Sequence, residues 1–326
     1  MKICLIGCGG QAIAAYMPSL IRYKKENEHI IYAGCCDVDL QKATEFKEKT
    51  GFTSAYSDHL EMMEREKPDA VILVTPFIHT AKIVLDILDF KPALMIEKPL
   101  GENLVQCMEI AEACEKKNIF TQTAFNRRHI PLIRELMKDI SSDPFPIQHI
   151  DYKMHRVNRT ESHFHTTAVH GIDLVGYIAG SDYHHVQFAY QKLKGFEKNN
   201  IANTYMQCEF KSGTTAHLSF CPVSGLVSER IEVMKDHQIW YVNLPIWKGP
   251  DSPGSIIKYE NGKMVYNKSG LVISDGIEMF EDNGFYCEVK EFIDTVRNAE
   301  SPKHSIRTAI DSMKIMDCMK SQITEV

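Results

Sequence analysis

The first 125 or so residues alternate short apolar runs with longer amphipathic stretches, and this alternation constrains the fold more than any other feature. Apolar runs indicate strands at 3–6, 30–36, 70–74, 93–96 and 119–124. The stretches between them have helical spacing, at 12–26, 40–50, 58–66, 80–88 and 104–117. Strands that alternate with helices predict a parallel sheet with helices on both faces.

After residue 128 the pattern changes, because strand-like segments follow one another instead of alternating with helices. Helices are predicted at 131–140 and 166–179, a strand at 147–155, several strands between 183 and 273, and two tail helices at 285–299 and 305–321. Grouped strands favour a mostly antiparallel sheet. We therefore predict an α/β chain with a doubly wound parallel sheet in residues 1–124 and an α+β domain with a large, mostly antiparallel open sheet in residues 125–326. Surface loops are predicted at 194–200 and 249–254.

Composition excludes several classes of protein. Lys and Arg number 37 and Asp and Glu 43, so the net charge of −6 argues against a nucleic-acid binder and gives no support to an anionic membrane surface. The longest apolar run, at 70–77, is too short to span a bilayer, and the first residues lack the long apolar region of a signal peptide. The ten cysteines form no C-x-x-C pair, which favours reduced thiols in a cytoplasmic protein without disulfides.

A glycine-rich turn directly follows the first predicted strand. The residues Gly7-Cys8-Gly9-Gly10-Gln11-Ala12 fit G-x-G-x-x-G/A, the fingerprint of a Rossmann dinucleotide-binding domain. Gly7 permits the tight turn, Gly9 lets the backbone approach a pyrophosphate, and Ala12 is small enough for close helix–strand packing. The helix N-terminus would offer N–H groups to the phosphates. The alternative is a purely structural glycine turn.

Asp37 ends the second predicted strand. A carboxylate at this place accepts hydrogen bonds from the adenosine ribose hydroxyls and repels a 2′-phosphate, so Asp37 favours NAD over NADP. The alternative is that Asp37 caps the helix that begins near Leu40, a role that Asp39 could fill equally well.

Four further segments carry a resemblance to a known family. They are Val74-Thr75-Pro76-Phe77-Ile78-His79, Glu97-Lys98-Pro99-Leu100, Phe125-Asn126-Arg127-Arg128 and His170-Gly171-Ile172-Asp173-Leu174. In this order and spacing the chain resembles the Gfo/Idh/MocA family, which includes glucose–fructose oxidoreductase and inositol dehydrogenase. The resemblance covers essentially the whole chain, and the E-K-P tripeptide is its most specific element.

The resemblance implies which residues contact the cofactor and the substrate. The cofactor-binding set is Gly7, Gly9, Gly10, Gln11, Ala12, Asp37, Thr75, Pro76, His79, Glu97, Lys98 and Asn126. Lys98 is implied to face both nicotinamide and substrate, where it could hydrogen-bond the reacting oxygen and share in proton transfer. The alternative for Lys98 is a surface lysine at a strand end. Pro99 biases Lys98 away from the helical region, and a cis peptide bond at this place is left open.

His170 is implied to be the second catalytic residue, as the proton acceptor from a substrate hydroxyl. Asp173 lies three residues on, hence on the same helix face, where it could orient the imidazole or bind a substrate hydroxyl. Many relatives carry a carboxylate four residues before this histidine, and this chain has Thr166, so the relay is incomplete unless Asp173 or His165 substitutes. The alternative for His170 is a core histidine.

The remaining substrate candidates also come from the resemblance. Arg127 and Asn126 match polar positions that reach the cleft in sugar-binding relatives, whereas Arg128 is interpreted as a structural ion-pair residue. His155 matches a polyol contact, although Val157 interrupts the usual pattern. Trp240, Tyr241 and Trp247 could form an apolar platform for a sugar ring or pack in the core or an interface. His163 and His165 lack nearby ligands that would complete a metal site, so no metal is predicted.

These observations lead to one hypothesis and two alternatives. The chain is predicted to be an NAD-dependent oxidoreductase acting on a secondary hydroxyl or carbonyl of a sugar, cyclitol or related polyol. The alternatives are redox-neutral glycoside cleavage through a transient keto-sugar with bound NAD, and a non-catalytic dinucleotide-binding regulator. A homodimer or homotetramer is expected, because one face of the large sheet has no helices of its own.

Overall fold

The computed structural model describes residues 1–196 and 201–326, which divide into two compact units. The first unit contains Met1–Asn126 and Phe285–Met313, and the second contains Arg127–Gly284 and Lys314–Val326. The sequence analysis assigned every residue after 124 to the second domain, whereas the structure groups Phe285–Met313 with the first unit. Residues 197–200 of the predicted loop at 194–200 lie outside the described residues.

The described residues of the first unit form a parallel sheet with the strand order β3-β2-β1-β4-β5-β6. Its strands are β1 (Lys2–Ile6), β2 (Ile31–Cys36), β3 (Ser54–Tyr56), β4 (Ala70–Leu73), β5 (Ala93–Glu97) and β6 (Thr121–Ala124). The side chains of β4 and β5 are buried throughout, as expected for strands covered on both faces. The predicted doubly wound sheet is therefore confirmed, and β3 is a strand that the sequence analysis missed.

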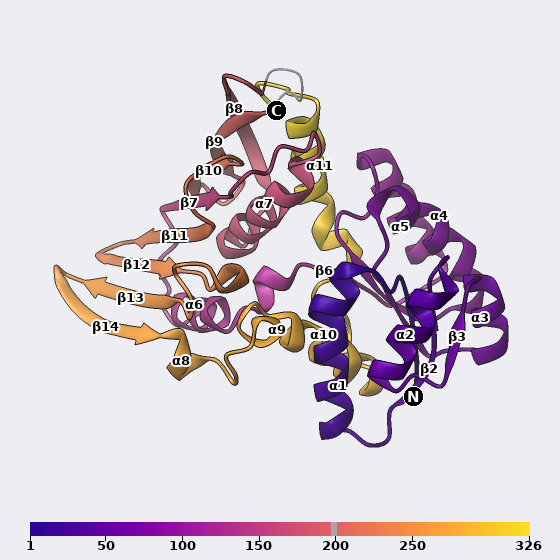
Figure 1. The fold of residues 1–326 in the computed structure, drawn as a ribbon. Coiled ribbons are helices and arrows are strands. Elements are labelled where there is room, and N and C mark those ends of the chain that lie inside the picture. The colour runs from indigo at the N-terminus through magenta and orange to yellow at the C-terminus, as the bar shows by residue number, and fades with distance from the viewer. Residues whose placement is uncertain (197–200) are drawn as a thin grey trace. The chain divides into compact units, whose positions relative to one another are not determined.

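Helices of the first unit connect and cover these strands (Figure 1). They are α1 (Met17–Glu26), α2 (Leu40–Thr50), α3 (His59–Glu66), α4 (Phe77–Ile87), α5 (Leu104–Lys116) and α10 (Phe285–Arg297), with 3₁₀ turns at Leu88–Phe90 and Ile306–Ala309. A π-helical turn, Ala12–Tyr16, precedes α1. Side chains of Asp39, Asp58 and Asn103 accept backbone N–H groups at the starts of α2, α3 and α5, which explains where these helices begin.

The segment Phe285–Met313 packs against the first unit through several contacts. Helix α10 lies against α1, and the rings of Phe120 and Phe292 are 6.0 Å apart. The Gln122 amide donates to the backbone oxygen of Glu288 at 3.2 Å. The backbone N–H of Thr123 donates to the carbonyl oxygen of His304 at 3.0 Å. The late segment therefore supplies partners to β6 at the edge of the parallel sheet.

The described residues of the second unit form a sheet in the order β14-β13-β12-β11-β7-β10-β9-β8. Its strands are β7 (His149–His155), β8 (Tyr183–Lys192), β9 (Ala202–Phe210), β10 (Thr215–Cys221), β11 (Ser228–Lys235), β12 (Gln238–Asn243), β13 (Ser255–Glu260) and β14 (Lys263–Ser269). Strands β7 and β10 are parallel, and the other neighbouring pairs are antiparallel. The predicted mostly antiparallel sheet is confirmed.

Helix α7 (His165–Ala179) covers the middle of one face of this sheet by packing on β7 and β10 (Figure 1). The other helices are α6 (Pro131–Ser141), α8 (Gly270–Ile273), α9 (Met279–Asp282) and α11 (Ile310–Lys320), and α11 begins within the first unit; short turns lie at Asn126–His129 and Ile246–Lys248. A Cβ at Gly171 would lie 2.3 Å from the ring of Tyr152, so glycine allows α7 to approach β7. No helix in the described parts of the chain is long and apolar enough to cross a membrane.

Candidate functional site

The glycine turn leaves β1 at the point where the strand order of the parallel sheet reverses, between β1 and β4. Gly7 has a φ of +98°, and a Cβ there would lie 2.1 Å from the carbonyl oxygen of Val74. A Cβ at Gly9 or Gly10 would instead meet no described atom within 4 Å outside its own stretch of chain. Gly7 is therefore required by the fold, whereas Gly9 and Gly10 present open backbone to a ligand, as a pyrophosphate requires at such a switch point.

Asp37 is half-buried beside this turn. One carboxylate oxygen accepts the backbone N–H of Cys8 at 2.9 Å, and the other accepts that of Asp39 at 3.0 Å. The side chain that caps α2 is Asp39, which accepts the backbone N–H of Gln41 at 3.1 Å. The alternative in which Asp37 caps this helix is therefore wrong. Asp37 ties the end of β2 to the glycine turn and keeps lone pairs for another donor.

Residues after β4 complete this end of the sheet. The Thr75 hydroxyl is buried and has no hydrogen-bond partner among the described residues, and its methyl group lies near Gly7. Pro76 and His79 are exposed at the start of α4. A buried hydroxyl without a protein partner is unusual, since such groups are normally satisfied. The open glycines, the Asp37 carboxylate and the Thr75 hydroxyl together fit a dinucleotide.

Glu97, at the end of β5, anchors the residues around Lys98. The Tyr16 hydroxyl donates to one Glu97 oxygen at 2.8 Å, and the backbone N–H of Lys98 donates to the other at 2.9 Å. The Gln11 amide lies 3.5 Å from the first oxygen. Burial raises the pKa of the Glu97 carboxyl, against the lowering effect of the Lys98 charge, and burial also raises the pKa of Tyr16.

Tyr16 is a residue of this site that the sequence analysis missed. It belongs to the π-helical turn, which carries Ala12, Ala15 and Tyr16 on its buried side. The wider turn follows the glycine motif directly, and such turns recur at functional sites. Lys98 is half-buried, and the Lys98–Pro99 peptide bond is cis. The structure thus fixes the backbone of Lys98 through Glu97 and Tyr16.

In the second unit, Asp173 pairs with Arg128. The guanidinium donates to both carboxylate oxygens at 2.7 and 2.5 Å, and both side chains are buried. The guanidinium also lies 5.4 Å from the centre of the Tyr177 ring. The structural role expected for Arg128 is therefore confirmed. The sequence analysis expected the Asp173 carboxylate to orient the His170 imidazole or to bind a substrate hydroxyl. Its ion pair with Arg128 is a contact that the sequence analysis did not predict.

A second buried ion-pair network surrounds Glu229, which the sequence analysis did not consider. Arg127 donates to both Glu229 oxygens at 2.8 and 3.2 Å, Tyr152 donates at 2.8 Å, and Arg156 donates as well. Burial alone would raise the pKa of this carboxyl, but the two guanidinium charges lower it to about 2. We refer to Glu229, Arg127, Arg156 and Tyr152 as the Glu229 network. It gives the predicted substrate residue Arg127 a fixed, buried position.

The other substrate candidates of the second unit lie at the end of β7 and in the first half of α7. The His155 imidazole is 3.0 Å from the Ser228 hydroxyl, and burial and the nearby Arg230 charge lower its pKa. Thr166 donates to the carbonyl oxygen of His163 at 2.9 Å in the first turn of α7. His170 is 8% exposed. Its convergence with Lys98 stays a prediction, because the two residues belong to different units.

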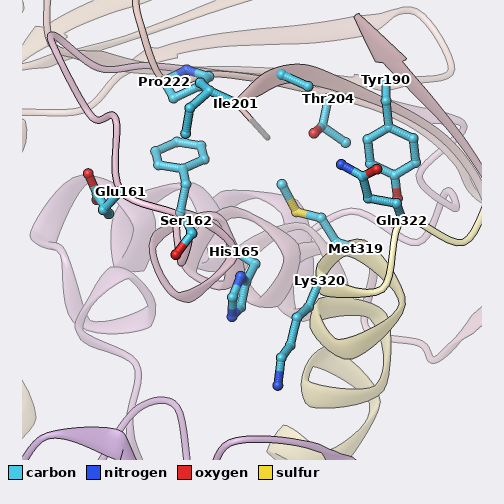
Figure 2. Close-up of a pocket in the computed structure, with 12 residues that line it drawn as sticks. Glu161, Ser162, His165, Tyr190, Ile201, Thr204, Pro222, Met319, Lys320 and Gln322 are labelled. Atoms are coloured by element: carbon cyan, nitrogen blue, oxygen red, sulfur yellow. The ribbon is translucent and has the colours of Figure 1, made fainter. Parts of the chain in front are cut away.

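A cavity of about 60 Å³ lies near the start of α7 (Figure 2). Its lining includes His165, Tyr190, Ile201, Thr204, Met319 and Lys320. Burial, together with the nearby charge of Lys320, lowers the pKa of His165 to about 4. His165 is therefore neutral near pH 7.

Comparisons with known proteins agree with this arrangement. Residues 1–125 match the GFO_IDH_MocA family, described as an oxidoreductase family with an NAD-binding Rossmann fold. The predicted resemblance to the Gfo/Idh/MocA family is therefore confirmed at the level of the family model for residues 1–125. The chain is 27% identical to myo-inositol 2-dehydrogenase of Thermotoga maritima over 173 residues. This match covers 49% of the chain and 50% of that enzyme, so it spans about half the length of the curated relative.

Solved structures share the fold over both units. A Gfo/Idh/MocA family oxidoreductase from Vibrio cholerae has a TM-score of 0.81 and 19% identity, with 99% of this chain and 98% of that chain covered. A 3-ketoreductase from Actinomadura kijaniata, solved with NADP and TDP-benzene, has a TM-score of 0.77 and 15% identity, with 98% and 96% covered. At these identities the likeness shows the fold alone.

Proposed function

We propose that the chain is an NAD(H)-dependent oxidoreductase that acts on a secondary hydroxyl or carbonyl of a sugar, cyclitol or related polyol. The observation that carries the proposal is the open glycine turn beside Asp37, in the same unit as a lysine anchored by Glu97. The similarity of half the chain to myo-inositol 2-dehydrogenase supports the substrate class.

The residues that would hold the cofactor are those of the glycine turn with Asp37 and Thr75. Backbone N–H groups at Gly9 and Gly10 suit the pyrophosphate, and the Asp37 carboxylate suits the ribose hydroxyls. The negative charge of Asp37 disfavours a 2′-phosphate, which supports NAD over NADP. When bound, the nicotinamide ring would donate the hydride or accept it.

Two residues would manage the proton. The Lys98 ammonium group hydrogen-bonds the reacting substrate oxygen and stabilises negative charge as it develops there. The His170 imidazole accepts the hydroxyl proton during oxidation and returns it during reduction. Glu97 fixes the backbone of Lys98, so the ammonium group starts from a defined position.

The substitution Lys98→Met tests this proposal, because methionine keeps the length of the side chain and removes its charge and donors. We expect turnover of ring polyols to fall by about 10²–10⁴-fold, with NADH binding, followed by its fluorescence, nearly unchanged. The matched control is Lys82→Met, which removes an exposed lysine paired with Asp86. Full activity of Lys98→Met would refute the proposed role of the Lys98 ammonium group. Failure of the wild type to turn over any polyol despite NADH binding would favour a non-catalytic role.

A further inference from the structure

The two tryptophans of the chain lie in different environments. Trp240 is fully buried, its indole N–H donates to Asp139 at 2.8 Å, and the Lys258 ammonium lies 4.9 Å from its ring centre. Trp247 is 44% exposed. The structure therefore assigns Trp240 to packing, whereas Trp247 presents indole surface outside the core of its unit.

The backbone that carries Trp247 is strained. Trp247 has φ 49° and ψ 37°, and Lys248 has φ 52°, so two successive residues other than glycine are left-handed. Such a conformation is unfavourable for bulky side chains and persists only where the surroundings impose it. Strain of this kind clusters at ligand clamps, so an observed outlier supports a functional hypothesis.

A buried amide imposes this conformation. The backbone N–H of Trp247 donates to the Asn283 side-chain oxygen at 3.0 Å, and the Asn283 amide group donates to the carbonyl oxygen of Pro245 at 2.7 Å. Asn283 is 1% exposed. One side chain thus holds both ends of the short turn, and the indole is attached to a rigid support.

The turn lies at the end of the sheet that carries His155. The backbone N–H of Leu244 donates to the carbonyl oxygen of Glu229 at 2.9 Å, directly after β12. Ser228 precedes Glu229 on β11 and pairs with His155 on the neighbouring strand β7. The Ser228 hydroxyl lies 3.0 Å from the His155 imidazole. Trp247 and the predicted polyol contact His155 therefore belong to one end of the second unit.

We propose that Trp247 is a stacking residue for a ring polyol, and that its indole face packs against the C–H face of a pyranose or cyclitol. The negative face of an aromatic ring attracts the polarised C–H groups of such a ring, and the rigid turn reduces the entropy lost on binding. An open-chain polyol offers no flat C–H face, so Trp247 selects for cyclic substrates. This inference rests on the proposed function for its substrate class.

Tryptophan fluorescence tests the inference without a measurement of turnover, because Trp247 is the exposed one of the two tryptophans. We expect saturating myo-inositol or D-glucose to lower acrylamide quenching of the wild type at least twofold, and sorbitol to leave it unchanged. The variant Trp247→Phe, which retains the buried Trp240, should show weak quenching that none of these polyols alters. Unchanged wild-type quenching with every cyclic polyol would overturn the inference.

Kinetics give a second readout with a matched control. Trp247→Ala should raise KM for a cyclic substrate about tenfold with little change in kcat, and Trp247→Phe should restore most of the loss. The control is Phe145→Ala, which removes an aromatic ring of similar exposure (50%) from the connection between α6 and β7 and should leave KM unchanged. Equal effects of the Trp247 and Phe145 substitutions would contradict the inference. If Lys98→Met loses turnover while cyclic polyols still protect its tryptophan fluorescence from acrylamide, then the stacking role of Trp247 holds independently of the proposed chemistry.

Discussion

Replacement of Glu229 by glutamine tests the electrostatics of the Glu229 network. The carboxylate is 0% exposed and faces two guanidinium groups, so Glu229→Gln leaves two buried positive charges without their counter-ion. The lowering of the Glu229 pKa from 4.5 to about 2 corresponds to about 3 kcal/mol in favour of the charged form. This agrees with the cost of about 3–5 kcal/mol for removing one partner of a buried ion pair.

Urea unfolding followed by tryptophan fluorescence measures this loss, because both tryptophans belong to the second unit. We expect Glu229→Gln to lower the free energy of unfolding by about 3 kcal/mol at pH 7. The control is Glu232→Gln on the same strand, where the side chain is half-exposed and the loss should stay below about 0.5 kcal/mol. In the wild type the stabilisation should persist above pH 4.5 and disappear as the pH falls toward 2. A loss below about 1 kcal/mol at pH 7 would refute the reasoning.

Four further predictions concern single residues. Asp37→Asn keeps an acceptor for Cys8 and removes the charge, so the ratio of kcat/KM for NADP to that for NAD should rise at least tenfold; an unchanged ratio would show that Asp37 does not select the cofactor. Burial raises the pKa of Asp282 to about 6, so the free energy of unfolding of the wild type should fall as the pH rises from 4 to 6. In urea titrations, Asp282→Asn should be about 2 kcal/mol more stable than the wild type at pH 8 and no more stable at pH 4. The lowered pKa of His165 means that the contribution of the neutral imidazole to stability is fully present above pH 6.5 and is lost as the pH falls toward 4. In thermal melts, His165→Gln should therefore show a weaker dependence of Tm on pH over this range than the wild type. Gly171→Ala should destabilise by about 2 kcal/mol in urea despite the higher helix propensity of alanine, because its Cβ would clash with Tyr152.

The features that the sequence predicted are those with a local signal. The glycine turn, Asp37 and the Glu97–Lys98 pair each lie at the end of an apolar strand, so their positions follow from the alternation of strands and helices. Strand β3 was missed because its three residues, Ser54–Tyr56, are too few to show a pattern. The π-helical turn was missed because one extra residue in a helix leaves no trace in composition.

The features that the sequence could not predict depend on long-range pairing. Glu229 lies on a strand with alternating burial, and nothing near it signals that Arg127, 102 residues away, supplies its partner. The same holds for Asp173, whose spacing from His170 pointed to a shared helix face, whereas Arg128 reaches it from 45 residues away. A buried charge finds its counter-ion only when the tertiary fold forms, so helix periodicity cannot identify the pair.

The return of residues 285–313 to the first unit has a consequence for how the protein is made. A ribosome releases residues 1–126 long before α10, yet Phe120 and the polar atoms of Gln122 and Thr123 find their partners on that later segment. The first unit therefore cannot complete its packing during the translation of residues 1–126. One flank of its sheet stays uncovered until residues 285–313 have left the ribosome.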